Sequence, residues 1–241
     1  TDLVIDFATK CGFSTIMIGS GTWTDSEGHF PINTRFFPRG IEDLKVTADR
    51  FKQAGFRVGL HFLAAAVHPN DAYISPVPDR RLVQDGEVTL AADVDEAATT
   101  ILSTTAPETF PATEGGYEGN SAVIRIGDEL IRYGSTSLED PVGFVRCERG
   151  YLKTKASAHK AGEPIVHIMR SYGLFLHDMD TSLTPELAKT VADIANTVGA
   201  GMLYFDGSER LQGPHWHYNA KLHKAFYDAL GRNDVLLQGS S

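Results

Sequence analysis

A carboxylate stands at the end of a short apolar segment. Asp206 closes the run MLYFD (202–206) and precedes Gly207, a residue typical of turns. Burying a carboxylate at the end of a strand costs free energy, and such a carboxylate is typically found where its charge serves catalysis or binding. Asp206 is therefore a candidate catalytic residue. The alternative is structural, because an aspartate in this place also caps the backbone amides that follow, here those near Ser208 and Glu209.

Aromatic and polar residues follow other apolar segments and are candidates for binding a substrate. Trp23 lies in the loop after the run FSTIMI (13–18), where its ring could stack on the apolar face of a sugar or, equally, anchor the loop. His61 lies near the end of FRVGLHFL (56–63), where it could bind a hydroxyl or a carboxylate, or serve a structural role. The remaining candidates for substrate binding are His177, Asp178, Glu209, His215 and Trp216.

The segments that must position these residues alternate between two patterns. Apolar residues at helical spacing, each followed by a glycine, predict helices over 2–11, 41–54, 184–198 and through Leu222, Phe226 and Leu230. Thr184 is the expected N-cap of the third, with Pro185 in its first position. Short apolar runs predict strands buried on both faces at 13–18, 56–63, 202–206 and 235–237.

This alternation predicts an α/β fold of parallel strands joined by helices. A (β/α) TIM-type barrel is favoured over a doubly wound sheet, because no G-x-G-x-x-G or Walker pattern follows any predicted strand. In such barrels the working residues lie at the carboxyl ends of the strands, which is where Asp206 and His61 are expected.

One part of the chain departs from this rhythm. Between 84 and 168 the sequence alternates as strands do, and a hairpin is expected at 122–126 and 129–133 around Gly127 and Asp128. We therefore expect a discontinuous barrel domain, 1–83 and 169–241, with a small β-rich domain, 84–168, inserted in it.

Composition excludes several classes of protein. Thirty-one acidic residues against 22 basic ones give a net charge of −9, the wrong sign for gripping nucleic acid. No apolar run approaches the roughly 18 residues that a membrane span needs. The two cysteines and nine histidines show no metal-ligand spacing, so no metal or organic cofactor is expected. Localisation stays open, with an extracellular or periplasmic site expected if the substrate is a polysaccharide.

Several stretches resemble a known enzyme family. DSEGHFPIN (25–33), FPRGIEDL (37–44), AGFRVGLH (54–61) and LYFDG (203–207) are similar to segments of the α-galactosidase-type retaining glycoside hydrolases of clan D. The resemblance covers roughly 13–63 and 171–207. It implies a TIM barrel in which Asp206, at the end of the fourth barrel strand, is the catalytic nucleophile.

The chain also departs from that family. Gly19 and Ser20 stand where paired acids typically end the second strand, and Tyr204 replaces a lysine two residues before the nucleophile. The family's acid/base aspartate follows the sixth strand, which would lie beyond Ser241. The resemblance therefore implies that the chain is part of a longer barrel, with the remaining strands or further domains as its partners.

A second, shorter resemblance lies in the insertion. Residues 146–162 (RCERGYLKTKASAHKAG) are similar to a small β module of phage structural proteins. That likeness implies a module that shapes the site or docks a neighbouring domain.

The function expected from the sequence is retaining hydrolysis of a glycosidic bond in an oligo- or polysaccharide, without a cofactor. Two alternatives remain open. A non-catalytic carbohydrate-binding barrel would keep the tryptophans and histidines but lack a second carboxylate. Another barrel enzyme, such as a lyase or aldolase, would need a strand-end lysine or a metal cluster, and no strand-end lysine is present.

Overall fold

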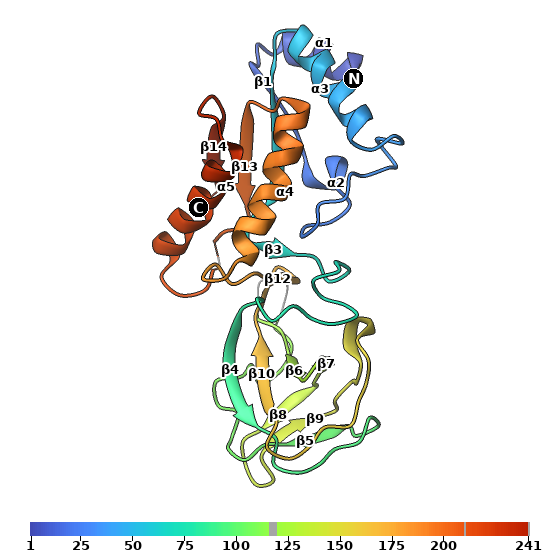
Figure 1. Ribbon diagram of the computed structural model, residues 1–241, viewed down its shortest axis with the longest axis vertical. Coiled ribbons are helices and arrows are strands. Elements are labelled where there is room, and N and C mark those ends of the chain that lie inside the picture. Colours follow the sequence, from blue (N-terminus) through green and yellow to red (C-terminus); the bar gives the residue numbers. More distant parts are fainter. Residues whose placement is uncertain (116–119, 210, 241) are drawn as a thin grey trace. The chain divides into compact units, whose positions relative to one another are not determined.

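The computed structural model describes residues 1–115, 120–209 and 211–240. These residues form two compact units, which we describe separately (Figure 1). Unit 1 comprises Thr1–Ala66 and Met179–Ser241, and unit 2 comprises Val67–Asp178.

Unit 1 is built on a sheet of four parallel strands. Its order is β1-β2-β13-β14, with bounds Thr15–Ile18, Arg57–Leu63, Met202–Asp206 and Leu236–Gly239 (Figure 1). The helices of this unit are α1 (Asp2–Lys10), α2 (Ser20–Trp23), α3 (Ile41–Gln53), α4 (Leu183–Val198) and α5 (His215–Leu230). The predicted α/β architecture is confirmed, while the strands described here form an open sheet and not a closed barrel.

Glycines end the helices as the sequence predicted. Gly199 and Gly231 follow α4 and α5 with φ of +67° and +64°, a left-handed conformation that glycine adopts without strain. The start of α4 was wrong by two residues: the N-cap is Ser182, and Thr184 is buried within the first turn. Thr184 lies inside the helix, with its side chain lining the groove between α4 and α5, so it is not at the helix end. The short helix α2 was not predicted.

The two faces of the parallel sheet have different surroundings. Side chains alternate along each strand, and those of Ile18, Leu60 and Leu203 share one face, which is buried. Phe62 and Phe205 continue that face and contact Phe226 of α5 with ring centroids 5.3 and 5.1 Å away. Helix α5 therefore packs on this face.

The opposite face is open. Met17 and Leu236, on the two edge strands, are 45% and 46% exposed. Between them on the same face lie His61 and Tyr204, which are opposite each other on β2 and β13. Among the described residues, no helix covers this face of the sheet.

The described part of unit 2, residues 67–115 and 120–178, has strands joined by loops and one 3₁₀ turn, η1 (Tyr151–Lys153). One antiparallel sheet has the order β4-β10-β6-β7, with bounds Gln84–Thr89, Pro164–Ile168, Val123–Ile126 and Glu129–Arg132. Another has the order β5-β9-β8, with bounds Thr100–Leu102, Gly143–Val145 and Ser135–Ser137. The short strands are β3 (Ala66–Val67), β11 (Arg170–Ser171) and β12 (Leu174–Leu176).

The predicted hairpin is present in unit 2. Strands β6 and β7 pair with Ile126 opposite Glu129, so Gly127 and Asp128 form its two-residue turn. The compact unit extends beyond 84–168, because the flanking segments pair with each other. Val83 donates its N–H to the Leu176 carbonyl, and Leu82 and His177 form an isolated bridge.

Candidate active site

Asp206 lies at the carboxyl end of β13, on the open face of the sheet. Its backbone carbonyl accepts the N–H of Ala64 at 3.2 Å, which ties the ends of β13 and β2 together. Its Oδ1 accepts the N–H of Gly207 at 2.9 Å, and its side chain keeps 37% of its surface exposed. The carboxylate is therefore fixed at its base and still accessible.

Gly207 is required by the turn that follows Asp206. Its φ is +68°, and a Cβ added there would lie 2.9 Å from Cδ2 of Leu63. A side chain would strain the backbone and press on β2. Because the chain turns sharply at Gly207, the Asp206 side chain lies at the carboxyl ends of the parallel strands.

His61 is the nearest polar neighbour of Asp206. Its Nε2 lies 3.0 Å from Oδ2 of Asp206, while its Nδ1 accepts the backbone N–H of Ser20 at 3.3 Å. Its ring stacks on Tyr204, with centroids 5.4 Å apart and an angle of 30° between the planes. The structure thus brings together two residues predicted from different strand ends.

The surroundings of Asp206 favour its ionised form. Partial burial raises the pKa of its carboxyl, but hydrogen bonds from His61, Ser240 and the Gly207 amide outweigh that effect. The net result is a pKa below the ordinary value of an aspartate. Asp206 is a carboxylate at neutral pH, the form that a nucleophile needs.

Ser240 is a site residue that the sequence analysis missed. It follows β14, the strand beside β13, and its hydroxyl donates to Oε1 of Glu209 at 2.8 Å. It also contributes to lowering the pKa of Asp206, so it lies near both acidic residues, and its single hydroxyl proton can serve one of them at a time. A signal was present in the sequence, because a polar residue directly after a strand lies at the same edge as the other strand ends.

Trp23 does not have the predicted role of a sugar platform. Its ring is fully buried, stacked on Phe30 at 5.8 Å and edge-on to Phe62 at 6.4 Å. Its Nε1 donates to the His61 carbonyl at 2.7 Å. Apolar neighbours in its own loop and on β2 cover the ring. The other interpretation, that Trp23 anchors the loop, agrees with this burial.

Trp216 and His215 open helix α5. Trp216 is 75% exposed, and His215 Nε2 lies 3.1 Å from the Ser208 carbonyl and 2.9 Å from Nδ2 of Asn219. Of the two tryptophans predicted to bind a substrate, only Trp216 presents its ring to solvent. His215 holds the loop after β13 in place.

His177 and Asp178 belong to unit 2. His177 is buried, and the backbone N–H of Asp178 donates to the Arg81 carbonyl. Their predicted part in substrate binding stays a prediction.

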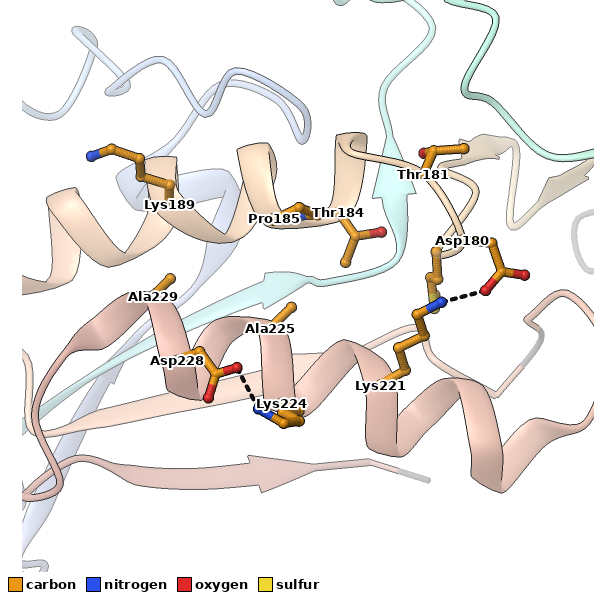
Figure 2. A pocket seen from close by; sticks show the side chains of 11 residues that line it. Asp180, Thr181, Thr184, Pro185, Lys189, Lys221, Lys224, Ala225, Asp228 and Ala229 are labelled. Carbon is orange, nitrogen blue, oxygen red and sulfur yellow. Dashed lines mark hydrogen bonds and ion pairs between the residues drawn. The ribbon is translucent and has the colours of Figure 1, made fainter.

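A groove lies between α4 and α5 on the helix layer of unit 1. Its volume is about 690 Å³, and Lys221 and Lys224 on α5 pair with Asp180 and Asp228 at its rim (Figure 2). None of the predicted site residues lines it.

Within residues 1–115, 120–209 and 211–240, no group of three or more His, Cys, Asp or Glu residues could hold a metal ion. In the same residues, no helix is long and apolar enough to span a membrane.

The fold is similar to that of sugar-processing enzymes. An α-galactosidase from Thermus thermophilus, solved in complex with stachyose, is 17% identical with a TM-score of 0.50, over 99% of this chain and 36% of that one. Sucrose 6F-phosphate phosphorylase from Thermoanaerobacter thermosaccharolyticum is 11% identical with a TM-score of 0.51, over 99% and 44%. An α-galactosidase from Lactobacillus brevis is 12% identical with a TM-score of 0.48, over 98% and 24%.

The similarities to the Thermus and Thermoanaerobacter structures show the fold alone, which is an α/β fold. The chain spans less than half the length of each of these three proteins. No protein-family model and no curated protein matches the sequence.

Proposed function

We propose that this chain is part of a retaining glycoside hydrolase in which Asp206 is the nucleophile. The observation that carries the proposal is the position of Asp206: it ends a central parallel strand on the uncovered face, with its pKa lowered by its hydrogen bonds. In the retaining glycoside hydrolases that this sequence resembles, the glycosidic bond is cleaved at the corresponding strand end. The fold of the solved structures supports the same class of substrate, since one of them holds an oligosaccharide.

The reaction proceeds in two steps. A carboxylate oxygen of Asp206 attacks the anomeric carbon, the bond to the leaving oxygen breaks, and that oxygen takes a proton from a second carboxyl group. Water, deprotonated by the second carboxylate, then hydrolyses the glycosyl ester and frees Asp206. In a retaining enzyme the two carboxyl groups lie about 5–5.5 Å apart.

The second carboxyl group comes from one of two sources. Glu209 accepts the hydroxyl of Ser240, which also lies near Asp206, but Glu209 is in the loop three positions beyond the strand end. The resemblance places the acid/base residue beyond Ser241, and we favour that source, because a residue on the opposite wall can reach the other side of the sugar. The fold supports this choice, since the sheet of unit 1 leaves one face and both edges open.

The partner of the open face is the rest of a (β/α) barrel. Both edge strands expose a large apolar side chain on that face, Met17 and Leu236. Helix α1 adds exposed Leu3 and Phe7. In a complete barrel the remaining strands pair with β1 and β14, and neighbouring helices cover α1. Unit 2 is then a β domain inserted in the chain between β2 and α4.

The test uses the natural polypeptide that carries these residues, with a panel of aryl glycosides and oligosaccharides. We expect Asp206→Asn to lower kcat by at least about 10³-fold while glycan binding and the fold persist. A 2-deoxy-2-fluoro glycosyl fluoride of the preferred sugar should label Asp206, as read by peptide mass spectrometry. Asp193→Asn, an exposed acid on α4 paired with Lys189, is the matched control and should keep full activity.

Three results would count against the proposal. Full activity of Asp206→Asn would exclude the nucleophile, and inversion of the anomeric centre, read by NMR of the first product, would exclude a retaining mechanism. Glycan binding by the wild type without any hydrolysis would favour a carbohydrate-binding barrel.

A further inference from the structure

The ring of His61 is held by hydrogen bonds at both of its nitrogens. The backbone N–H of Ser20 can only donate, so Nδ1, 3.3 Å away, must accept and carries no proton. The proton of a neutral ring is then on Nε2, which donates to Oδ2 of Asp206 at 3.0 Å. The surrounding backbone therefore selects one tautomer of the ring.

Neighbouring side chains hold the orientation of that ring. Tyr204, directly opposite on β13, stacks against it. The carbonyl of His61 accepts the indole N–H of Trp23, whose ring is fully buried. The loop that carries Ser20 is thus anchored to the strand that carries His61, and the imidazole cannot turn without breaking these contacts.

This arrangement decides between two roles for a His–Asp pair. In one, aspartate orients the histidine, and the other ring nitrogen takes a proton from the substrate. In the other, the histidine orients the aspartate. The first role needs a free lone pair on Nδ1, and here the Ser20 amide occupies it. The second role needs only the Nε2–H bond to Asp206, which is present.

We propose that His61 is a positioning residue for Asp206, a neutral donor at Nε2 that fixes the rotamer of the attacking carboxylate and accepts no proton from the substrate. This inference rests on the proposed nucleophilic role of Asp206 and assigns to His61 a different task from direct contact with the sugar.

The tautomer itself is the first test. In the wild-type protein labelled with ¹⁵N-histidine, long-range ¹H–¹⁵N spectra should show His61 protonated at Nε2 and unprotonated at Nδ1 at neutral pH. His61→Gln assigns the signal by its disappearance. A ring protonated at Nδ1, or at both nitrogens, would overturn the inference whether or not the protein hydrolyses glycans.

Kinetics of two variants form the second test. His61→Leu removes the donor, so kcat should fall roughly 10- to 100-fold with little change in KM, and the acid limb of the pH profile should move to higher pH. His61→Gln keeps an N–H donor and should recover part of the loss. His68→Gln, a histidine in unit 2 bonded to the Asn70 amide, is the control and should match the wild type.

The outcomes separate this inference from the proposed function. If wild-type protein shows no hydrolysis, the proposed function fails, and titration of the ¹³C-labelled Asp206 carboxyl still tests His61: its pKa should be higher in His61→Leu than in the wild type. An unchanged titration in a folded His61→Leu protein would overturn the positioning role, whereas His61→Gln, which keeps an N–H donor, should titrate between His61→Leu and the wild type. If His61→Leu does not fold, the wild-type tautomer decides.

Discussion

Neutralising Glu129 should destabilise unit 2 strongly. This side chain lies at the start of β7 with 1% of its surface exposed. It accepts two hydrogen bonds from the Arg149 guanidinium, at 2.8 and 2.7 Å, and one from the Gly150 amide at 2.8 Å. The Ser157 amide and His159 Nε2 complete its contacts at 3.1 and 2.8 Å. One carboxylate thus ties the long segment after β9 to the hairpin β6–β7.

The expected cost follows from these contacts. Glu129→Gln keeps the size but turns an amide toward Arg149, whose buried charge then has no counterion. Removing one partner of a buried ion pair typically costs about 3–5 kcal/mol. For a unit the size of 67–178, that cost lowers Tm by about 10–25 °C.

The effect also depends on pH. Burial raises the pKa of Glu129, but the bonds from Arg149, His159 and the two amides outweigh it, so the folded-state pKa is lowered. The carboxylate therefore stabilises the fold above the unfolded pKa of about 4.3, and this contribution is lost as the pH falls through the folded pKa. Glu129→Gln should lack this part of the acid dependence.

The assay is thermal and urea unfolding of the full chain, with amide hydrogen exchange in β6, β7 and β10 to report on unit 2. Glu148→Gln is the matched control: Glu148 pairs with Arg132 at the surface, with 52% and 49% of the two side chains exposed, and should cost less than about 1 kcal/mol. If Glu129→Gln is no less stable than Glu148→Gln, the buried network does not hold the unit together.

Two further predictions concern the support of the candidate site. Trp23→Ala should destabilise unit 1 by about 3–5 kcal/mol in urea unfolding, because it empties the space between Phe30 and Phe62. Trp23→Phe should cost much less. An unchanged free energy of unfolding in Trp23→Ala would contradict the role of Trp23 as loop anchor. Gly207→Ala should cost about 1–2 kcal/mol in the same assay, because the new Cβ meets Leu63 and the φ is positive; equal stability would show that the turn relaxes freely.

The elements of unit 1 were predictable because local signals agreed. Apolar residues at helical spacing, followed by a glycine, predicted α3, α4 and α5, and short apolar runs predicted the four strands of the parallel sheet. The pairing of His61 with Asp206 was also within reach, because the ends of neighbouring parallel strands meet at one edge. The burial of Trp23 was not, since its cover comes from Phe30 in an irregular loop, where sequence has no periodicity that would reveal it.

The open face explains one systematic difference between sequence and structure. The strand-like runs at 13–18 and 235–237 were read as buried on both faces, yet Met17 and Leu236 are half exposed. These apolar side chains sit at the two edges, on the face without helices, while the central strands of the same face carry Tyr204 and His61. In the interior of a (β/α) barrel, apolar side chains from different strands pack together, and polar side chains at the carboxyl ends of the strands form the active site. Apolar residues on the edge strands and polar residues near the strand ends match that pattern. The pattern of the strands is thus consistent with our proposal that further β/α units cover this face.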